Sequence, residues 1–173
     1  MANIETQLKD LKKKLEGVFG SLTTKKSMKR IGNYLVEDMQ KRVRLGYGVR
    51  EQLGKRESFK SMGKTGKGHT PRYIAYRKKN KALLDSTTRP GKQNLTFTGQ
   101  LVRDIRLVKV TKANFTVGHS NKSRKGETLT NRELSGFVQI EGSRPYLNVT
   151  NLEYKRLLRF YQNNIVKPTL AKI

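Results

Sequence analysis

The sequence predicts an α+β protein in which a small antiparallel sheet packs with N-terminal and C-terminal helices, and from which a long basic loop extends. Apolar residues near both ends of the chain recur every three or four positions, which is the spacing of a buried helix face. Two β-branched runs separated by a short polar turn lie between them. A chain of this length usually forms one domain, so we expect a single domain over residues 1–173.

The N-terminal part of the chain is expected to form two helices. The first covers residues 2–18, where a heptad-like stripe would pack on the protein's own core or on a neighbouring copy. The second runs from about Thr23 to Leu45, and Gly46 is placed to end it. The apolar positions are Ile4, Leu8, Leu11, Leu15 and Val18 in the first stripe, and Met28, Ile31, Leu35, Met39 and Val43 in the second.

Residues 46–69 lack apolar periodicity, and six of them are glycine. A stretch of this length and composition is normally a functional or disordered loop, so we expect a basic loop excursion here. Between Lys41 and Lys92, sixteen Lys and Arg face three acids, a local excess of +13 (16 − 3). The loop cations that we expect to contact DNA or an acidic partner are Arg50, Lys55, Arg56, Lys60, Lys64 and Lys67.

Two short helices are expected in the middle of the chain. Thr70 is a suitable N-cap, and Pro71 fits the first helical position because its missing N–H would be unpaired there anyway. After a loop over residues 85–94, the segment Leu95–Leu101 is expected to turn into a short helix capped by Thr98.

The residues that follow predict a β-hairpin. Residues 105–111 alternate in polarity, contain several β-branched side chains and lack helix or strand breakers. Residues 112–114 supply a turn, and residues 115–119 form the returning strand. A second polar loop is expected from Ser120 to Glu127.

The last third of the chain predicts two helices joined by an extended segment. Asn131 is expected to cap a helix that continues through Ile140. Residues 142–147 should be extended, because a proline disfavours the helical conformation of the residue before it. Thr150 and Glu153 have the spacing of a capping box, which begins a final helix that Pro168 is expected to end.

Charge is the strongest compositional feature. Lys and Arg total 38 against 13 acids, a net charge of +25. A monomer this cationic repels itself, so we expect nucleic acid or an acidic protein surface beside it. The chain has no cysteine, which excludes disulfides and thiolate metal sites and suits assembly in a reducing cytoplasm. No apolar run approaches the roughly 20 residues of a membrane span, so no membrane association is expected.

The sequence offers no catalytic or cofactor-binding pattern. Gly63-Lys64-Thr65 resembles the end of a phosphate-binding loop, but Ser58 stands where that loop requires its first glycine. The acids are scattered singly, and two histidines are too few for an imidazole-rich metal site. We therefore expect a non-enzymatic protein without cofactor or metal.

Aromatic residues are interleaved with basic ones in two places. Tyr47, Phe59, Tyr73 and Tyr76 could stack on single-stranded bases. The simpler interpretation, which we favour, is that Tyr73 and Tyr76 anchor their short helix to the core.

The order of several short motifs resembles the virion-morphogenesis (neck and tail-completion) proteins of tailed bacteriophages. The motifs are a helix start at Tyr73–Arg77, a Leu-x-x-Thr-Gly-x-Leu segment at Leu95–Leu101, and an Arg-Pro-aromatic-Leu strap at Arg144–Leu147. Residues 136–142 stand where that family usually has a helix ending in Glu-x-Gly. The resemblance spans nearly the whole chain. The residues expected to anchor the core or a neighbouring subunit are Leu95, Thr98, Gly99, Leu101, Arg144, Pro145, Tyr146 and Leu147.

The resemblance implies a structural protein of the virion, assembled in the host cytoplasm. It implies a homo-oligomeric ring of six or twelve copies between the head connector and the tail, in contact with connector, neck or tail-tube proteins. Genomic DNA would pass through the lumen, which gives the basic loop a polyanion to face. Two alternatives remain. One is a cytoplasmic, sequence-independent nucleic-acid-binding protein of ribosomal or nucleoid type, and the other is a nuclease, for which the clustered acids are missing.

Overall fold

The computed structural model describes residues 22–62, 70–84, 99–121, 128–139 and 144–171, together with residues 13, 16, 17, 20 and 91. The apolar stripe predicted for residues 2–18 lies outside the described residues, as do residues 63–69 and 92–98. Within the described part, the chain is a mixture of helices and two small antiparallel sheets, which confirms the predicted α+β class. The sequence predicts only one of the two sheets, the hairpin that follows Asp104.

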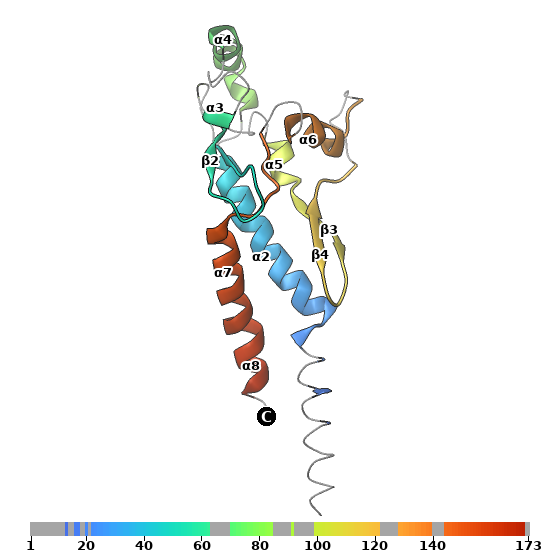
Figure 1. The fold of residues 1–173 in the computed structure, drawn as a ribbon. Helices are drawn as coiled ribbons and strands as arrows, with labels where there is room; N and C mark the ends of the chain where they lie inside the picture. The colour runs from blue at the N-terminus through green and yellow to red at the C-terminus, as the bar shows by residue number, and fades with distance from the viewer. Residues whose placement is uncertain are drawn as a thin grey trace, which may run out of the picture.

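Helix α2 (Lys25–Arg44) is the central element of the fold. The Thr24 side chain caps its N-terminus by accepting a hydrogen bond from the backbone N–H of Ser27 at 3.0 Å. The helix ends at Leu45, and Gly46 follows with a φ of 90°, which confirms both the predicted helix and its terminator. In Figure 1, α2 runs diagonally between the C-terminal helices on one side and a hairpin on the other.

Residues 46–62 fold closely against α2, which corrects the expectation of a loop over 46–69. Strand β1 (Tyr47–Gly48) pairs antiparallel with β2 (Glu57–Ser58), and the short helix α3 (Phe59–Met62) follows directly. Three apolar residues of this segment are fully buried, and they are Val49, Phe59 and Met62. A few well-placed apolar side chains therefore suffice to fold a stretch that is rich in glycine and lysine.

Helix α4 (Pro71–Lys79) begins where the sequence predicts, with Thr70 as its N-cap and Pro71 at its first position. A 3-10 turn, η1 (Lys81–Leu83), follows it. Tyr73 and Tyr76 are 38% and 51% exposed, so the expectation that both rings anchor α4 to the core is wrong. Figure 1 places α4 at the end of the molecule farthest from the C-terminus.

Helix α5 (Gln100–Arg103) leads into the predicted hairpin, whose strands are β3 (Arg106–Val110) and β4 (Phe115–Gly118). The N-cap of α5 is Gly99 with no side-chain cap, and not Thr98, which lies outside the described residues. The two strands pair antiparallel with an irregularity between Leu107 and Lys109. One face of this hairpin packs on α2.

Helix α6 (Asn131–Gln139) and the final helices follow the hairpin. The cap of α6 is Thr130 and not Asn131, because the Thr130 hydroxyl accepts from the Glu133 N–H while the Glu133 carboxylate accepts from the Thr130 N–H. Asn131 is instead buried inside the helix start.

Helix α7 (Asn151–Tyr161) opens with the predicted capping box of Thr150 and Glu153. Pro168 does not end the helical run: a π-helical turn, η2 (Gln162–Val166), leads into α8 (Lys167–Leu170), which contains it. The π-helical turn just before Pro168 changes the hydrogen-bond pattern of the run, since the Lys167 N–H donates to the Gln162 carbonyl five residues earlier, and the helix accommodates the proline there.

The core consists of two clusters that α2 connects. The larger lies between α2, α3, α5 and the segment 144–149, and its buried members are Val36, Val43, Phe59, Met62, Leu101, Val102, Ile105 and Tyr146. The smaller joins Leu35, Met39 and Val149, with Phe115 and Leu157 packed against it. Among the described residues, no helix combines the length and the apolar composition needed to cross a membrane.

Candidate functional site

The segment predicted as a strap crosses the larger core cluster. Tyr146 is completely buried at its centre, and Leu101 is buried beside it. The backbone on either side is held in place, because the Pro145 carbonyl accepts from the Val49 N–H at 2.8 Å and Arg144 Nε donates to the Phe59 carbonyl at 3.3 Å. Leu101 and Tyr146 are thus core anchors, whereas the sequence left open whether they contact the core or a neighbour.

The remaining predicted anchors are less deeply placed. Pro145, Arg144 and Leu147 are partly buried, and Leu147 packs against the larger core cluster. Gly99 is buried with a φ of 71°, a backbone conformation that a side chain would strain. Leu95 and Thr98 lie outside the described residues.

A buried polar network surrounds Tyr146. Its hydroxyl donates to Ser135 Oγ and contacts His119 Nε2, both at 2.8 Å. On the other side of His119, the Nδ1 atom lies 3.8 Å from Asp104 Oδ2. Asp104 also accepts hydrogen bonds from Ser120, Asn131 and Arg106. The network joins α5, β4, α6 and the strap through their side chains.

Burial sets the protonation of this network. It lowers the pKa of His119 to about 4, an effect that Asp104 opposes and Arg106 reinforces, so the imidazole is neutral at pH 7. Burial alone would raise the pKa of Asp104, but hydrogen bonds from Ser120 and Asn131 and the charge of Arg106 outweigh it and lower that pKa. Burial also raises the pKa of Tyr146.

The chain of Asp104, His119, Tyr146 and Ser135 contains the residue types of a proton relay. All four residues are nevertheless at most 5% exposed. Reactive hydroxyls need contact with a substrate, whereas these are enclosed in the core. We therefore interpret the network as a structural tie between elements. Among the described residues, no group of three His, Asp or Glu side chains could hold a metal ion.

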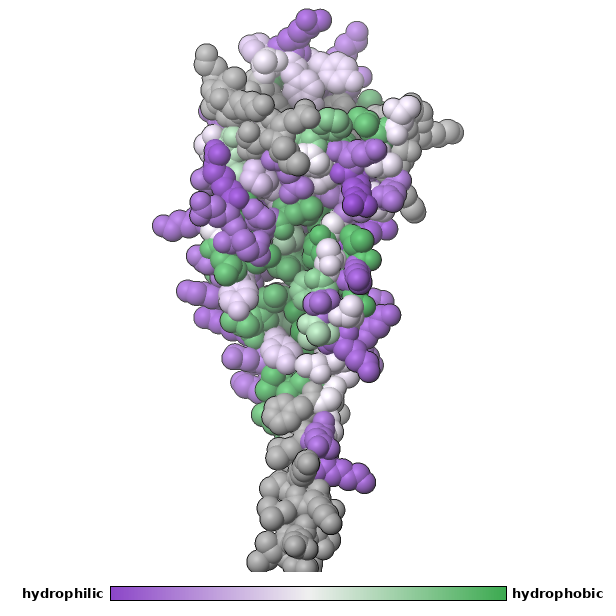
Figure 2. Space-filling model, turned by 45° about the vertical axis from the view of Figure 1, so that its right-hand side comes forward, coloured by the Kyte–Doolittle hydropathy of each residue, from purple (hydrophilic) through white to green (hydrophobic). Residues whose placement is uncertain are grey.

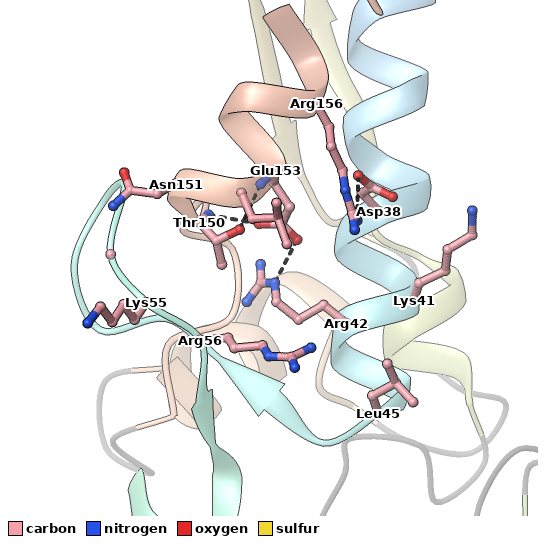
Figure 3. Close-up of a pocket in the computed structure, with 12 residues that line it drawn as sticks. Asp38, Lys41, Arg42, Leu45, Lys55, Arg56, Thr150, Asn151, Glu153 and Arg156 are labelled. Atoms are coloured by element: carbon pink, nitrogen blue, oxygen red, sulfur yellow. Dashed lines mark hydrogen bonds and ion pairs between the residues drawn. The ribbon is translucent and has the colours of Figure 1, made fainter. Parts of the chain in front are cut away.

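A second polar site is open to solvent. It is a groove of about 750 Å³ between α2, the turn at residues 54–56 and the start of α7. Figure 3 shows Arg56 extending into it beneath Arg42, while Arg156 reaches across to Asp38. We call it the basic groove, and its lining residues are Asp38, Lys41, Arg42, Leu45, Gly54, Lys55, Arg56, Thr150, Asn151, Leu152, Glu153 and Arg156.

The floor of the basic groove is a buried ion pair. Arg42 Nε lies 2.8 Å from Glu153 Oε1, and the two side chains are 6% and 5% exposed. Arg42 Nη2 also donates to the carbonyls of Tyr146 and Asn148, at 3.0 and 2.8 Å. The pair thus attaches α2 to both the strap and the capping box of α7. Arg42 Nη1 is buried with no hydrogen-bond partner among the described residues.

The groove has more cations than its own acids can neutralise. Glu153 is paired with Arg42, and Asp38 lies 3.7 Å from Arg156. Within the part of the chain that the structure describes, Lys41, Lys55 and Arg56 form no ion pair. Arg56 lies 4.9 Å from the centre of the Tyr47 ring, which supports its guanidinium without neutralising it.

A constrained turn presents two of these cations. Leu53 has a φ of 59°, a conformation that costs a branched residue about 1 to 2 kcal/mol. Its N–H donates to the Val149 carbonyl at 2.7 Å, and the carbonyl of the next residue, Gly54, accepts from the Asn151 N–H at 3.2 Å. These bonds hold the strained backbone, so Lys55 begins from a fixed position.

The predicted cations are placed unequally by the fold. Lys55 and Arg56 line the basic groove, whereas Lys60 is exposed on α3 and lines no part of it. Arg50 is paired with Glu57 at 2.7 Å on the surface. Lys64 and Lys67 lie outside the described residues.

Sequence reasoning missed the acceptor side of the groove. The pairing of Glu153 with Arg42 and of Asp38 with Arg156 was not expected, because α2 and α7 lie far apart in the chain. The available signal was the capping-box glutamate Glu153, whose position fixes where the start of α7 must lie. The partner of Glu153 is Arg42 on α2, and only the tertiary fold brings these two residues together.

The sequence matches no protein-family model, and neither a curated protein nor a solved structure shows significant similarity to it. The resemblance to neck and tail-completion proteins therefore stays a prediction, and the functional interpretation depends on the residues themselves.

Proposed function

We propose that this protein is a structural component of a tailed-phage particle. In this proposal it forms a ring of six or twelve copies at the head–tail junction, joins the connector to the tail and surrounds the path of the DNA. It performs no catalysis, and its function is the geometry of assembly.

The observation that carries the proposal is the presence of two separate sets of exposed apolar side chains. Tyr154 and Leu158 are 42% and 43% exposed on α7. Val108 on β3 and Phe137 on α6 are exposed to a similar or greater extent. Helix α7 lies on one side of α2, and the β3–β4 hairpin and α6 lie on the other (Figure 1). A closed ring needs two different surfaces on each subunit, because each copy contacts its neighbours head to tail.

The distribution of hydropathy supports a surface that is covered in an assembly. When the hairpin side of the molecule is turned forward, a band of apolar surface runs down the face between hydrophilic flanks (Figure 2). Large exposed apolar areas on small proteins usually mark interaction sites. The net charge of +25 makes copies of the protein repel one another, so an assembly of them needs anionic neighbours.

Particle composition tests the proposal. Gradient-purified phage particles, separated heads and separated tails are analysed by quantitative mass spectrometry against the major capsid protein. The protein should be present in complete particles at about six or twelve copies, as the proposed ring requires. Its absence from purified particles would overturn the proposal.

A specific observation also favours sequence-independent nucleic-acid binding as a second candidate. The Tyr73 and Tyr76 rings are stacked, with centroids 6.2 Å apart, and both are exposed on α4. Arg72, Lys78 and Lys79 are exposed on the same helix. Exposed aromatic rings beside cations are suited to stacking on unpaired bases.

Binding of a labelled oligothymidylate at two salt concentrations tests this candidate. The single-strand function predicts submicromolar affinity with a steep salt dependence. It also predicts that Tyr73→Ala with Tyr76→Ala weakens binding about tenfold or more, while the double replacement by Phe preserves it. Equal affinity of the Ala and Phe variants would remove stacking from consideration.

A further inference from the structure

We propose that the basic groove is a docking site for an acidic, leucine-bearing segment of another protein. This inference rests on the proposed assembly role, because it names the chemistry of one neighbour in that assembly. It differs from the DNA contact that the charge alone suggests.

First, the lining of the basic groove carries more positive than negative charge. Its two acids are occupied by Arg42 and Arg156, at 2.8 and 3.7 Å, and three cations remain at its edge. A segment with two or three carboxylates would complete this arrangement. Charge-assisted hydrogen bonds of this kind are the stronger polar contacts in proteins.

The second argument is the apolar contribution of the same groove. Leu45 and Leu152 line it and are 57% and 55% exposed. Leu45 immediately follows α2, and Leu152 lies in the first turn of α7, so the two come from different elements. Exposed leucines give no advantage to a phosphate ligand, but they bury area against a leucine or phenylalanine of a peptide.

The third argument is preorganisation. The turn that carries Lys55 and Arg56 is fixed by the hydrogen bonds of Leu53 to Val149 and of Gly54 to Asn151, the first residue of α7. The floor of the groove is fixed by the buried pair of Arg42 and Glu153. A strained residue that the surrounding structure holds in place is typical of binding sites, because the ordering cost is already met before the ligand arrives.

These features favour a protein over nucleic acid. Leu45 and Leu152 bury apolar area only against a ligand that has apolar side chains, and a phosphate backbone has none. The concave volume of about 750 Å³ lies in the range that accepts a few side chains. A DNA duplex is convex and needs an open surface of cations.

Fluorescence anisotropy of the full chain tests the inference with a defined probe. The probe is a labelled synthetic peptide that contains four glutamates and three leucines separated by glycines. Two matched peptides replace either all glutamates by glutamine or all leucines by serine. We expect both replacements to weaken binding about tenfold or more, which corresponds to about 1.4 kcal/mol each.

Matched variants locate the binding site. The triple variant Lys41→Gln, Lys55→Gln, Arg56→Gln should weaken binding of the acidic peptide about tenfold or more. The control Lys29→Gln, Lys109→Gln, Lys112→Gln removes the same charge from exposed positions away from the groove, and it should change affinity less than about threefold. Likewise, Leu45→Ser with Leu152→Ser should weaken binding, whereas Leu83→Ser with Leu170→Ser should not.

Two outcomes would overturn the inference. Equal effects of the two triple variants would mean that the peptide responds only to net charge. In the second outcome, a short DNA duplex binds more tightly than the peptide and loses its affinity in the Lys41, Lys55, Arg56 variant. That result would assign the groove to nucleic acid. Neither result affects the particle composition that tests the assembly role, so the two proposals can fail separately.

Discussion

Arg42 is the residue on which the packing of three segments depends. Replacing it with Met removes its hydrogen bonds to Tyr146 and Asn148 and leaves the Glu153 carboxylate buried without its cation. Breaking a buried pair in this way typically costs about 3 to 5 kcal/mol. We expect Arg42→Met to lower the free energy of unfolding by this amount in urea denaturation.

The matched control is a pair on the surface. Arg50 and Glu57 form an ion pair of similar length, but their side chains are 52% and 42% exposed. Arg50→Met should therefore change stability by less than about 1 kcal/mol. Similar losses for Arg42→Met and Arg50→Met would show that the buried pair does not hold the fold together.

Gly48 gives a second prediction at the residue scale. A Cβ atom at this position would lie 2.3 Å from the Pro145 carbonyl oxygen and 2.8 Å from the Phe59 ring. Because backbone must move to admit it, Gly48→Ala should destabilise the protein by about 2 kcal/mol or more.

Gly136 in α6 is the matched control for this substitution. It has open space around its Cβ position, so Gly136→Ala should be neutral or stabilising by up to about 1 kcal/mol. Thermal unfolding of both variants measures the difference. An unchanged melting temperature in Gly48→Ala would contradict the close approach of the strap to β1.

At the scale of elements, the network around His119 makes stability depend on pH. The pKa of His119 is about 4 in the folded protein and 6.5 ordinarily. Between pH 4 and pH 6.5 the unfolded chain therefore binds one more proton than the folded protein. Stability is therefore complete above pH 6.5 and falls as the pH drops towards 4, by up to about 3 kcal/mol. The pKa of Asp104 is lowered from its ordinary value of 3.8, so protonation of this carboxylate reduces stability only below about pH 3.8, outside the range in which His119 titrates.

The comparison with His119→Gln isolates this contribution. The protein is strongly cationic, so repulsion among its positive charges also increases as its acids are protonated at low pH. This repulsion increases equally in the variant, so it does not affect the comparison. We expect His119→Gln to be less stable at pH 7 and to have a shallower decline between pH 6.5 and pH 4 in urea titrations. Parallel curves for the two proteins would refute the buried neutral imidazole.

The elements that the sequence predicted are those with local signals. Helix α2, the β3–β4 hairpin and the capping box of Thr150 and Glu153 are encoded within a few neighbouring residues, and all three are confirmed. Residues 46–62 were assigned to a loop because they lack apolar periodicity. Their folded structure depends on contacts with a distant segment of the chain. The Val49 N–H, for example, donates to Pro145, 96 residues away (145 − 49).

The candidate site was predictable only in part for the same reason. Lys55 and Arg56, which line the groove, were predicted to contact DNA or an acidic partner because they lie in a basic stretch of the sequence. Their neighbours in the groove come from α2 and α7, and sequence alone does not bring those helices together. Pro168 was misjudged because its effect depends on helical position, and η2 places it in the first turn of α8.

At the scale of the whole molecule, the proposed ring predicts how interface variants combine. Tyr154→Ser with Leu158→Ser alters one face, and Val108→Ser with Phe137→Ser alters the other. Each double variant should fail to form rings in native mass spectrometry. An equal mixture should give dimers through the one intact pair of faces, because head-to-tail contact joins unlike surfaces.

The control alters two exposed leucines away from these faces. Leu83→Ser with Leu170→Ser should leave ring formation unchanged. A mixture of the two interface variants that restores complete rings, or rings formed by either variant alone, would contradict head-to-tail contact through these surfaces.

The most direct measurement of the account is a cryo-EM map of the intact particle at its head–tail junction. We expect a ring of six or twelve copies of this fold between connector and tail, with α7 of each copy against the hairpin and α6 of the next. A junction built entirely from other proteins would contradict it.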